Sequence, residues 1–219
     1  MRTIQFANGE FYHIFNRGVD KRVIFTNQRE MQRFFQSMCE FNTIHPSGGI
    51  YANTLHLKKI NPRSRASSER LVDFVCYCLN PNHYHFILQQ IADKGIEKFI
   101  HRLATGYTKY FNAKHKRSGV LFQGKYKAVH IETNEQLLHA SVYVNLNFKV
   151  HQPRSSASKS SDIQPLSSWS EYVGKVKHNF CQKEDILGQF KNKADYKKFA
   201  ERTLPSILER KEILRELEE

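Results

Sequence analysis

Apolar and polar positions along the first 150 residues recur at two spacings, one typical of strands and the other of helices. A β-rich run over residues 10–17 ends at Gly18 and predicts a first strand followed by a turn. Asn27 is a suitable N-cap residue, and the apolar side chains after it recur at helical spacing: Met31, Phe34, Phe35, Met38 and Phe41. This pattern predicts an amphipathic helix over residues 28–42 whose aromatic stripe packs on a sheet.

The next predicted elements are a long loop and a hairpin. Residues 45–70 lose periodicity and carry prolines, paired glycines and a Ser/Arg-rich stretch, so they predict an exposed loop. Two β-rich runs, residues 72–79 and 83–88, then flank the tripeptide Asn-Pro-Asn at 80–82. A short Pro/Asn connection between two such runs predicts a β-hairpin.

Two more helices and one more strand follow the hairpin. Apolar side chains at helical spacing predict a helix near residues 95–115, and residues 121–131 predict a fourth strand. Thr133 and Gln136 form a capping-box pattern ahead of another apolar stripe, which predicts a third helix from about 134 to 148.

The order strand, helix, strand, strand, helix, strand matches the ferredoxin-like split βαβ motif, with the third helix as an addition. We therefore expect an α+β domain over residues 1–150, built on an antiparallel sheet. Residues 151–167 are rich in Ser and Pro and predict a linker. Residues 168–219 predict a small helical tail, with helical segments at 183–202 and 204–219.

The candidate chemistry begins at the second strand of the hairpin. His83 and His85 stand two residues apart, so their side chains share one face of the strand, which is a spacing for metal ligands. Tyr143 and Asn147 stand four residues apart in the third helix and share one face of it. The sequence thus predicts a site in which a phenol nucleophile and an amide ligand face two histidines.

Two alternatives are open for this chemistry. Cys76 and Cys78 also share a strand face, and together with the histidines they could hold a structural zinc ion. Three other tyrosines compete for the role of nucleophile: Tyr107, Tyr110 and Tyr126. The first two continue an apolar stripe, which favours core packing, whereas the third could stack on a base beside neighbouring lysines.

Charge points to the partner. Lys and Arg number 34 against 21 Asp and Glu, and the net charge of +13 favours nucleic acid as an anionic partner. No run of eighteen apolar residues predicts a membrane span, and four cysteines without disulfide spacing favour a reducing compartment, so we expect a cytoplasmic protein. The residues expected to contact DNA are Arg17, Lys114, Lys116, Arg117, Lys125, Tyr126 and Lys127.

Four sequence blocks in consistent order resemble the HUH single-tyrosine transposases and, within them, the REP-associated tyrosine transposases. The blocks are Phe-Tyr-His-Ile-Phe-Asn-Arg-Gly at 11–18, Leu-Asn-Pro-Asn-His-Tyr-His at 79–85, Leu-Phe-Gln-Gly-Lys-Tyr-Lys at 121–127 and Tyr-Val-Asn-Leu-Asn at 143–147. Residues 167–172, Ser-Ser-Trp-Ser-Glu-Tyr, resemble the tail of the same group. Each block is short, and their order makes the resemblance specific.

The resemblance implies that His83 and His85 hold a divalent ion, magnesium or manganese, with Asn147 as the third ligand and Tyr143 as the nucleophile. It also implies a single-stranded DNA substrate, commonly a hairpin, that is cut and rejoined through a 5′-phosphotyrosine intermediate. We expect a monomer, although insertion-sequence relatives act as dimers. Two rival functions are a non-catalytic single-stranded nucleic-acid binder with an RNA-recognition-like fold and a metal-dependent hydrolase that uses water as its nucleophile.

Overall fold

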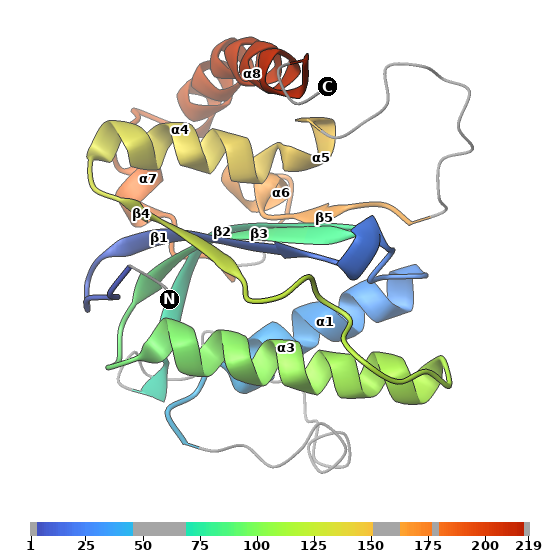
Figure 1. Ribbon diagram of the computed structural model, residues 1–219. Coiled ribbons are helices and arrows are strands. Elements are labelled where there is room, and N and C mark those ends of the chain that lie inside the picture. The colour runs from blue at the N-terminus through green and yellow to red at the C-terminus, as the bar shows by residue number, and fades with distance from the viewer. Residues whose placement is uncertain (1–3, 46–68, 151–162, 177–179, 217–219) are drawn as a thin grey trace.

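The computed structural model describes residues 4–45, 69–150, 163–176 and 180–216 and shows a single five-stranded sheet with helices on both faces (Figure 1). In their spatial order the strands are β4 (Lys127–Ile131), β1 (Phe11–Arg17), β3 (His83–Gln90), β2 (Val72–Asn80) and β5 (Leu166–Ser167). Every neighbouring pair is antiparallel. The predicted α+β class and the ferredoxin-like arrangement of the first four strands are confirmed.

The helices divide between the two faces of this sheet (Figure 1). One face is covered by α1 (Gln28–Phe41) and α3 (Gly95–Lys114), and the other by α4 (Asn134–Asn145), over which α8 (Lys193–Glu216) lies. The described residues also form four short helices: the 3₁₀ turn η1 (Val19–Lys21), α5 (Asn147–Val150), α6 (Trp169–Tyr172) and α7 (Glu184–Leu187). The segment predicted as a loop at 45–70 and the linker predicted at 151–167 lie mostly outside the described residues.

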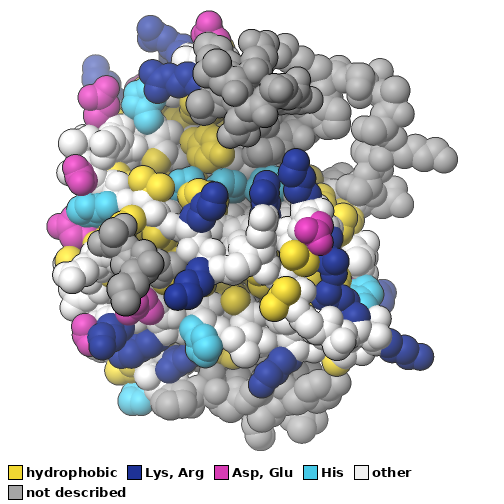
Figure 2. Space-filling model, in the orientation of Figure 1, with side chains coloured by type: hydrophobic (Ala, Val, Ile, Leu, Met, Phe, Trp, Pro, Cys, Tyr) yellow, Lys and Arg dark blue, Asp and Glu magenta, His cyan; other side chains and the backbone are white. Residues whose placement is uncertain are grey.

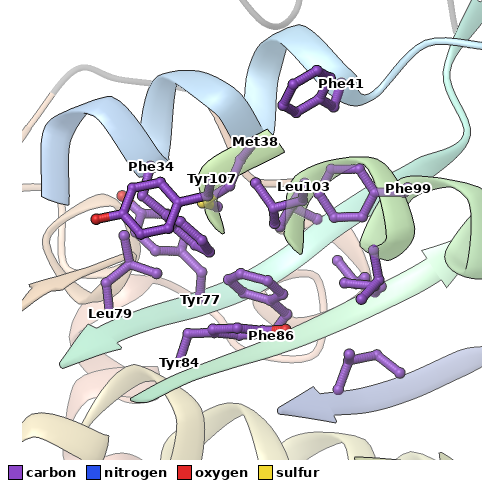
Figure 3. Close-up of a cluster of buried hydrophobic side chains, with 14 of the residues drawn as sticks. Phe34, Met38, Phe41, Tyr77, Leu79, Tyr84, Phe86, Phe99, Leu103 and Tyr107 are labelled. Atoms are coloured by element: carbon purple, nitrogen blue, oxygen red, sulfur yellow. The ribbon is translucent and has the colours of Figure 1, made fainter. Parts of the chain in front are cut away.

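The main hydrophobic core fills the space between the sheet and helices α1 and α3 (Figure 3). Tyr84 and Phe86 project from β3 toward Phe34 of α1, and the ring of Phe34 meets Tyr107 of α3 edge-on at 4.9 Å between centroids. All four side chains are almost completely buried. The aromatic stripe of α1 therefore packs on the sheet, as its spacing predicts.

The opposite face carries a second, smaller core. Cys76 and Cys78 of β2 and Ile87 of β3 pack there with Leu137 and Val144 of α4. The tail adds further side chains to this core from α6, α7 and α8, namely Tyr172, Ile186 and Tyr196. Strand β2 is buried along its whole length because it has neighbours on both faces and both edges.

The two predicted helix starts are confirmed by their caps. The side chain of Asn27 accepts a hydrogen bond from the backbone N–H of Glu30 at 3.1 Å. Thr133 and Gln136 form the reciprocal capping box that their spacing predicts. At the start of α1 the carboxylate of Glu30 accepts hydrogen bonds from the backbone N–H and the hydroxyl of Thr26, at 2.8 and 2.9 Å.

Two predicted elements begin or end elsewhere. Strand β4 starts at Lys127 and not at 121. The segment before it forms a single isolated β-bridge, between Gly18 and Phe122, and then turns at Gly124, whose φ is +60°. The third helix stops at Asn145, and Asn147 opens the separate turn α5. Asn147 nevertheless keeps a position beside the end of α4.

The tail also differs from its expected form. Leu166 and Ser167, at the end of the predicted linker, form β5 and extend the sheet beside Cys78 and Leu79. The two helical segments expected at 183–202 and 204–219 are the short α7 and one long helix, α8, which continues through Pro205. A proline inside a helix removes one backbone hydrogen bond, and here the helix accommodates that loss without ending.

Candidate active site

The two histidines of the hairpin lie where strand alternation places them. His83 and His85 are on the face of β3 that looks toward α4, and their rings meet at 90° with centroids 5.2 Å apart. His85 is only 6% exposed, whereas His83 is half-buried at the end of the strand. Asn80 pairs with His83 across the hairpin, and Cys78 pairs with His85. The sheet thus presents both imidazoles to the helix that carries Tyr143.

Asn147 completes a polar triangle with His83 and Asn80. The Oδ1 atom of Asn147 lies 3.0 Å from Nε2 of His83, and Nδ2 of Asn80 donates to Oδ1 of Asn147 at 2.9 Å. The same Nδ2 group of Asn80 lies 3.0 Å from Nε2 of His83. On its other side, His83 Nδ1 donates to the side-chain oxygen of Asn82 at 2.6 Å.

A neutral His83 ring carries its proton on one nitrogen, and both nitrogens face amide oxygens. The shorter contact, 2.6 Å from Nδ1 to Asn82, favours the tautomer with the proton on Nδ1 and a lone pair on Nε2. That lone pair faces the carbonyl oxygen of Asn147, so two acceptors lie 3.0 Å apart with Asn80 donating to both. Two convergent acceptors at this separation are a suitable pair of neighbouring ligands for a cation. Adjacent ligands about 2.1 Å from an octahedral ion lie about 3.0 Å apart.

The amide nitrogen of Asn147 adds a second observation. The side chain is fully buried, and its Nδ2 makes no hydrogen bond of standard geometry among the described residues, although Asn147 contacts the Tyr143 phenol, whose pKa burial raises and this contact lowers. A buried donor without a partner is uncommon in folded proteins and often marks a place where a ligand or a reacting group belongs. Tyr143, one helical turn earlier, is the neighbouring phenol.

Tyr143 stands over the histidines. Its ring meets His85 edge-on at 5.4 Å and a third histidine, His13, edge-on at 5.7 Å between centroids. Burial raises the pKa of the Tyr143 phenol, and the contact with Asn147 acts in the opposite direction. The nucleophile expected from the sequence is therefore beside His85 and the expected amide, in a partly dry environment that favours the protonated phenol.

Sequence reasoning missed His13, which β1 brings into the same cluster. Its Nε2 lies 2.9 Å from Nδ1 of His85, and the two rings stack at 5.1 Å with an interplanar angle of 20°. Burial lowers the pKa of His13 to about 4, so its ring is neutral at pH 7. The available signal was the alternation of β1, which places His13 and Phe15 on one face and Tyr12 and Ile14 on the core face.

The competing tyrosines lie elsewhere. Tyr107 is fully buried, and its hydroxyl donates to the carbonyl of Ile24 at 2.8 Å. Tyr110 packs beside Tyr107 in the same core. Tyr126 is half-buried near the start of β4 and packs against that core. Tyr143, by contrast, has ring contacts with both His13 and His85.

The alternative zinc site receives no support from the described residues. No three His, Cys, Asp or Glu side chains come together there as a potential metal-binding group. Cys76 and Cys78 lie in the apolar core under α4 and α6, and burial raises the pKa of both thiols, for Cys78 to about 12. A thiolate is the form that binds zinc, and this environment disfavours it. The side chains that could hold an ion at this site are His83, His85 and Asn147, and of these His83 Nε2 and Asn147 Oδ1 lie 3.0 Å apart. Two imidazoles suit zinc at least as well as magnesium or manganese, so the identity of the ion is an expectation from the family resemblance.

Some of the residues expected to contact DNA are exposed, and others form contacts with groups of the protein itself. Lys116, Lys125 and Lys127 are exposed, whereas Lys114 forms an ion pair with the buried carboxylate of Glu30 at 2.8 Å. His115 contacts the same carboxylate at 2.7 Å. Lys114 therefore has a structural partner inside the fold, which reduces the charge that it offers to a ligand.

The two arginines also have protein partners. Arg17 donates through Nε to the side chain of Gln123. Arg117 donates to the side chain of Asn112 at 2.7 Å and to the carbonyl of Val120 at 3.2 Å. In the view of Figure 2, Lys and Arg side chains lie across the face that carries β4 and the chain between α3 and β4, with few acidic side chains among them.

A cavity of about 370 Å³ opens beside this basic surface. Two of the expected DNA-binding residues, Lys125 and Tyr126, line it. Its other walls come from β1, α3 and the segment before β4, and they mix apolar and polar groups: Asn16, Ile100, His101, Thr105 and Phe122 among them. The cavity is large enough for one nucleobase and lies on the core side of the sheet, away from Tyr143.

The fold and the cluster of His83, His85, Asn147 and Tyr143 define an α+β protein with a candidate nucleophile-and-ligand site for phosphoryl chemistry. The sequence model of the family described as IS200-like transposases matches residues 56–147, a segment that contains all four of these residues. This match confirms the resemblance stated above for that segment. His13 lies outside it.

Comparison with solved structures finds a REP-associated tyrosine transposase, determined bound to a REP hairpin. It is 13% identical to this chain, with a TM-score of 0.49, and the alignment covers 80% of this chain and 86% of that one. No curated protein matches the chain. Among the described residues, no helix is both long enough and apolar enough to span a membrane.

Proposed function

We propose that this protein is a metal-dependent DNA strand transferase that cuts and rejoins single-stranded DNA through Tyr143. The observation that carries the proposal is the convergence of four side chains from two distant segments: the lone pair of His83 Nε2, the oxygen of Asn147, the ring of His85 and the phenol of Tyr143. Their inclusion in the segment that matches the IS200-like transposase family supports the same function.

The chain's own residues have distinct tasks in this reaction. His83, His85 and Asn147 would hold a magnesium or manganese ion, which when bound supplies positive charge at the scissile phosphate. Tyr143 loses its phenolic proton to solvent, and its oxygen attacks the phosphorus. The bond from phosphorus to the 3′ oxygen breaks, and that oxygen takes a proton from water and leaves as a hydroxyl. The 5′ phosphate remains on Tyr143, so a 3′ hydroxyl can later reverse the step.

Burial around Tyr143 has a consequence for this step. A phenol whose pKa is raised by desolvation is a poor nucleophile at neutral pH until charge nearby stabilises the phenolate. The Nδ2 group of Asn147 is one donor in position to stabilise the phenolate, and positive charge at the histidines would stabilise it more strongly. This arrangement keeps Tyr143 unreactive in the absence of the ion and substrate.

The basic surface would bind the DNA strand. Exposed lysines at 116, 125 and 127 neutralise phosphates, and the cavity beside Tyr126 offers an aromatic wall against which an unpaired base can stack. Single-stranded or hairpin DNA exposes bases that can enter such a cavity, whereas a perfect duplex keeps them stacked. We therefore propose a single strand, commonly folded as a hairpin, as the substrate.

We also propose that the chain acts as a monomer. The helix that carries Tyr143 is covered by α8 of the same chain, where the hydroxyl of Tyr196 lies 3.0 Å from both Ser141 Oγ and Asn145 Nδ2. These buried contacts hold α4 against its own sheet. Light scattering of the full chain at micromolar concentration should give the mass of one copy, and a stable dimer there would contradict this proposal.

The decisive experiment is to trap a covalent protein–DNA species. Incubation of the full chain with hairpin DNA and Mn²⁺, followed by denaturation, should leave an adduct that peptide mass spectrometry locates on Tyr143. Tyr143→Phe removes one hydroxyl, so its stability should stay within roughly 1 kcal/mol of wild type and its DNA binding should persist, yet no adduct should form.

Tyr110→Phe is the matched control, since it makes the same change at a tyrosine far from the histidines, and it should form the adduct normally. An adduct on another tyrosine, or an active Tyr143→Phe variant, would overturn the assignment of the nucleophile. DNA cleavage without any adduct would favour hydrolysis by water, and DNA binding without cleavage would favour the non-catalytic binder.

A further inference from the structure

His13 is a polar side chain in the candidate site that the proposed chemistry does not use. It comes from β1, where it is diagonal to His85 on β3, because Phe15 is the direct partner of His85 in the register. The His13 Nε2 atom lies 2.9 Å from His85 Nδ1, a hydrogen-bond distance between two imidazoles. One of these two nitrogens must carry the proton, and the other must accept it.

His83 shows which direction of this hydrogen bond suits a metal ligand. Its Nδ1 donates to Asn82 Oδ1 at 2.6 Å, which leaves the lone pair on Nε2, facing Asn147. His85 has the same pattern of contacts, because a neighbour again lies against its Nδ1. If Nδ1 of His85 donates as that of His83 does, both rings offer Nε2 lone pairs. If the bond runs the other way, Nε2 of His85 is protonated and cannot bind a cation.

We propose that His13 is a positioning residue: its Nε2 accepts a hydrogen bond from Nδ1 of His85 and fixes the tautomer of His85 whose Nε2 can hold the divalent ion. The proposal rests on the proposed function for its metal, but the tautomer itself is a property of the metal-free chain. Side chains that bond the second nitrogen of a ligating histidine commonly set the orientation and basicity of the ligand in this way.

Packing around the two rings restricts the alternatives. Phe15 stacks on His85 at 5.3 Å and on His13 at 4.9 Å, with small interplanar angles of 16° and 27°. Tyr143 meets both histidine rings edge-on. His85 is therefore held between an aromatic ring in its own sheet and the nucleophile above it. A change at His13 alters the hydrogen bond while Phe15 continues to define the plane of His85.

The first test measures the tautomer directly. Long-range ¹H–¹⁵N NMR of the metal-free full chain at neutral pH distinguishes protonated from unprotonated ring nitrogens, and His85→Gln assigns the signal of His85. We expect His85 to be protonated at Nδ1 in the wild-type chain. A His85 signal protonated at Nε2 would overturn the proposal whatever the chain does with metal or DNA.

Two variants separate the hydrogen bond from packing. His13→Phe keeps a ring in place but removes the acceptor, so His85 should lose its preference for the Nδ1-protonated form. Mn²⁺ affinity, measured by calorimetry, should then fall by about 10- to 100-fold. His13→Gln restores an acceptor oxygen and should recover most of both properties. His130→Phe is the control, because His130 on β4 stacks on Tyr12 at the other face of the sheet.

The remaining outcomes test the positioning role of His13, the identity of the ligands and the dependence on metal. Wild-type affinity in His13→Phe, or a folded His13→Gln that is as weak as His13→Phe, would overturn the positioning role. Pulsed electron paramagnetic resonance counts histidine nitrogens on Mn²⁺ bound to the wild-type chain, and two are expected; three would make His13 a ligand and also overturn the positioning role. The expected tautomer in a wild-type chain that binds no Mn²⁺ would support the hydrogen bond and overturn the metal-dependent function.

Discussion

The two faces of the sheet use the same strands for opposite purposes. Along β3, Tyr84, Phe86 and Leu88 point toward α1 and α3 and are buried in an apolar core, whereas His83 and His85 point toward α4. The core face is dry and interlocked, and its contacts are non-directional. The other face sets polar groups at defined separations around Tyr143. Strand alternation makes this division possible, because side chains on opposite faces of one strand have different neighbours. The α4 face is not entirely polar, since Ile87 of β3 belongs to the second apolar core there.

The difference also shows in how polar groups are arranged. On the core face, the hydroxyl of Tyr107 donates to the carbonyl of Ile24 at 2.8 Å and so completes a local contact. At the polar face, His83 Nε2 and the side-chain oxygen of Asn147 converge at 3.0 Å. Buried polar groups that face one another without apolar neighbours between them are a costly arrangement for folding alone, and they suit the binding of a ligand.

The largest expected effect comes from substitutions confined to the polar face around Tyr143. Replacing His83 and His85 together by alanine should abolish DNA cleavage, because these two side chains would hold the proposed ion that supplies positive charge at the scissile phosphate. Hairpin binding should persist, since affinity comes mainly from phosphate neutralisation by basic side chains. Gel-based cleavage and fluorescence-anisotropy binding assays measure the two properties on the same protein.

The stability of that double variant tests the comparison further. The variant loses hydrogen bonds worth about 0.5–1.5 kcal/mol each and leaves the apolar core intact, so it should remain folded. Asn147→Ala should reduce cleavage less than the double histidine change, because an amide is a neutral ligand that water can replace. A double histidine variant that cleaves DNA at the wild-type rate would show that the polar face has another role.

The second largest effect comes from a substitution confined to the main core, on the other face of the sheet. Phe86 is fully buried and contacts Phe34, Phe74 and Tyr84, so Phe86→Ala should lower the free energy of unfolding by about 3–5 kcal/mol. Urea denaturation of the full chain measures this change. Any Phe86→Ala protein that remains folded should still form the covalent DNA adduct, because the histidine face is preserved. A loss below about 1 kcal/mol would contradict the assignment of this face as the main core.

Much of the fold was predictable because it follows from local pattern. The stripe of α1, the hairpin at Asn80-Pro81-Asn82 and the capping box at Thr133 are all encoded within a few residues, and each is confirmed. The proximity of Tyr143 to His85 could also be anticipated, once the ferredoxin-like order places the added helix against the sheet. Family resemblance supplied the expected roles of these residues.

What could not be predicted depends on long-range register. The contact of His13 with His85 joins residues 72 positions apart, and a shift of one residue between β1 and β3 would have placed His13 on the core face. The same holds for Lys114, whose partner Glu30 lies on another helix. Strand β5 was missed because a pair of residues is too short to show a period. Spacing identifies faces of elements, and only tertiary structure identifies neighbours.

The smallest expected effect concerns charge, and it separates the lysines that we propose bind DNA from a lysine that supports the fold. Lys125→Ala and Lys127→Ala combined should weaken hairpin binding and make the log–log dependence of affinity on salt shallower by about 1.4, since each neutralised phosphate on a single strand contributes about 0.7 to the slope. Both side chains are exposed, so the free energy of unfolding should stay within about 0.5 kcal/mol of wild type.

Lys114→Ala is the contrasting variant. It leaves the buried carboxylate of Glu30 with His115 and Thr26 as its remaining partners, so it should lower stability more than it changes the salt slope. Binding titrations between about 50 and 200 mM salt, combined with urea denaturation of each variant, measure both quantities. If Lys114→Ala changed the slope as much as one of the exposed lysines does, its ion pair with Glu30 would have to open on DNA binding, and the division between fold-supporting and DNA-binding charges would fail at this position.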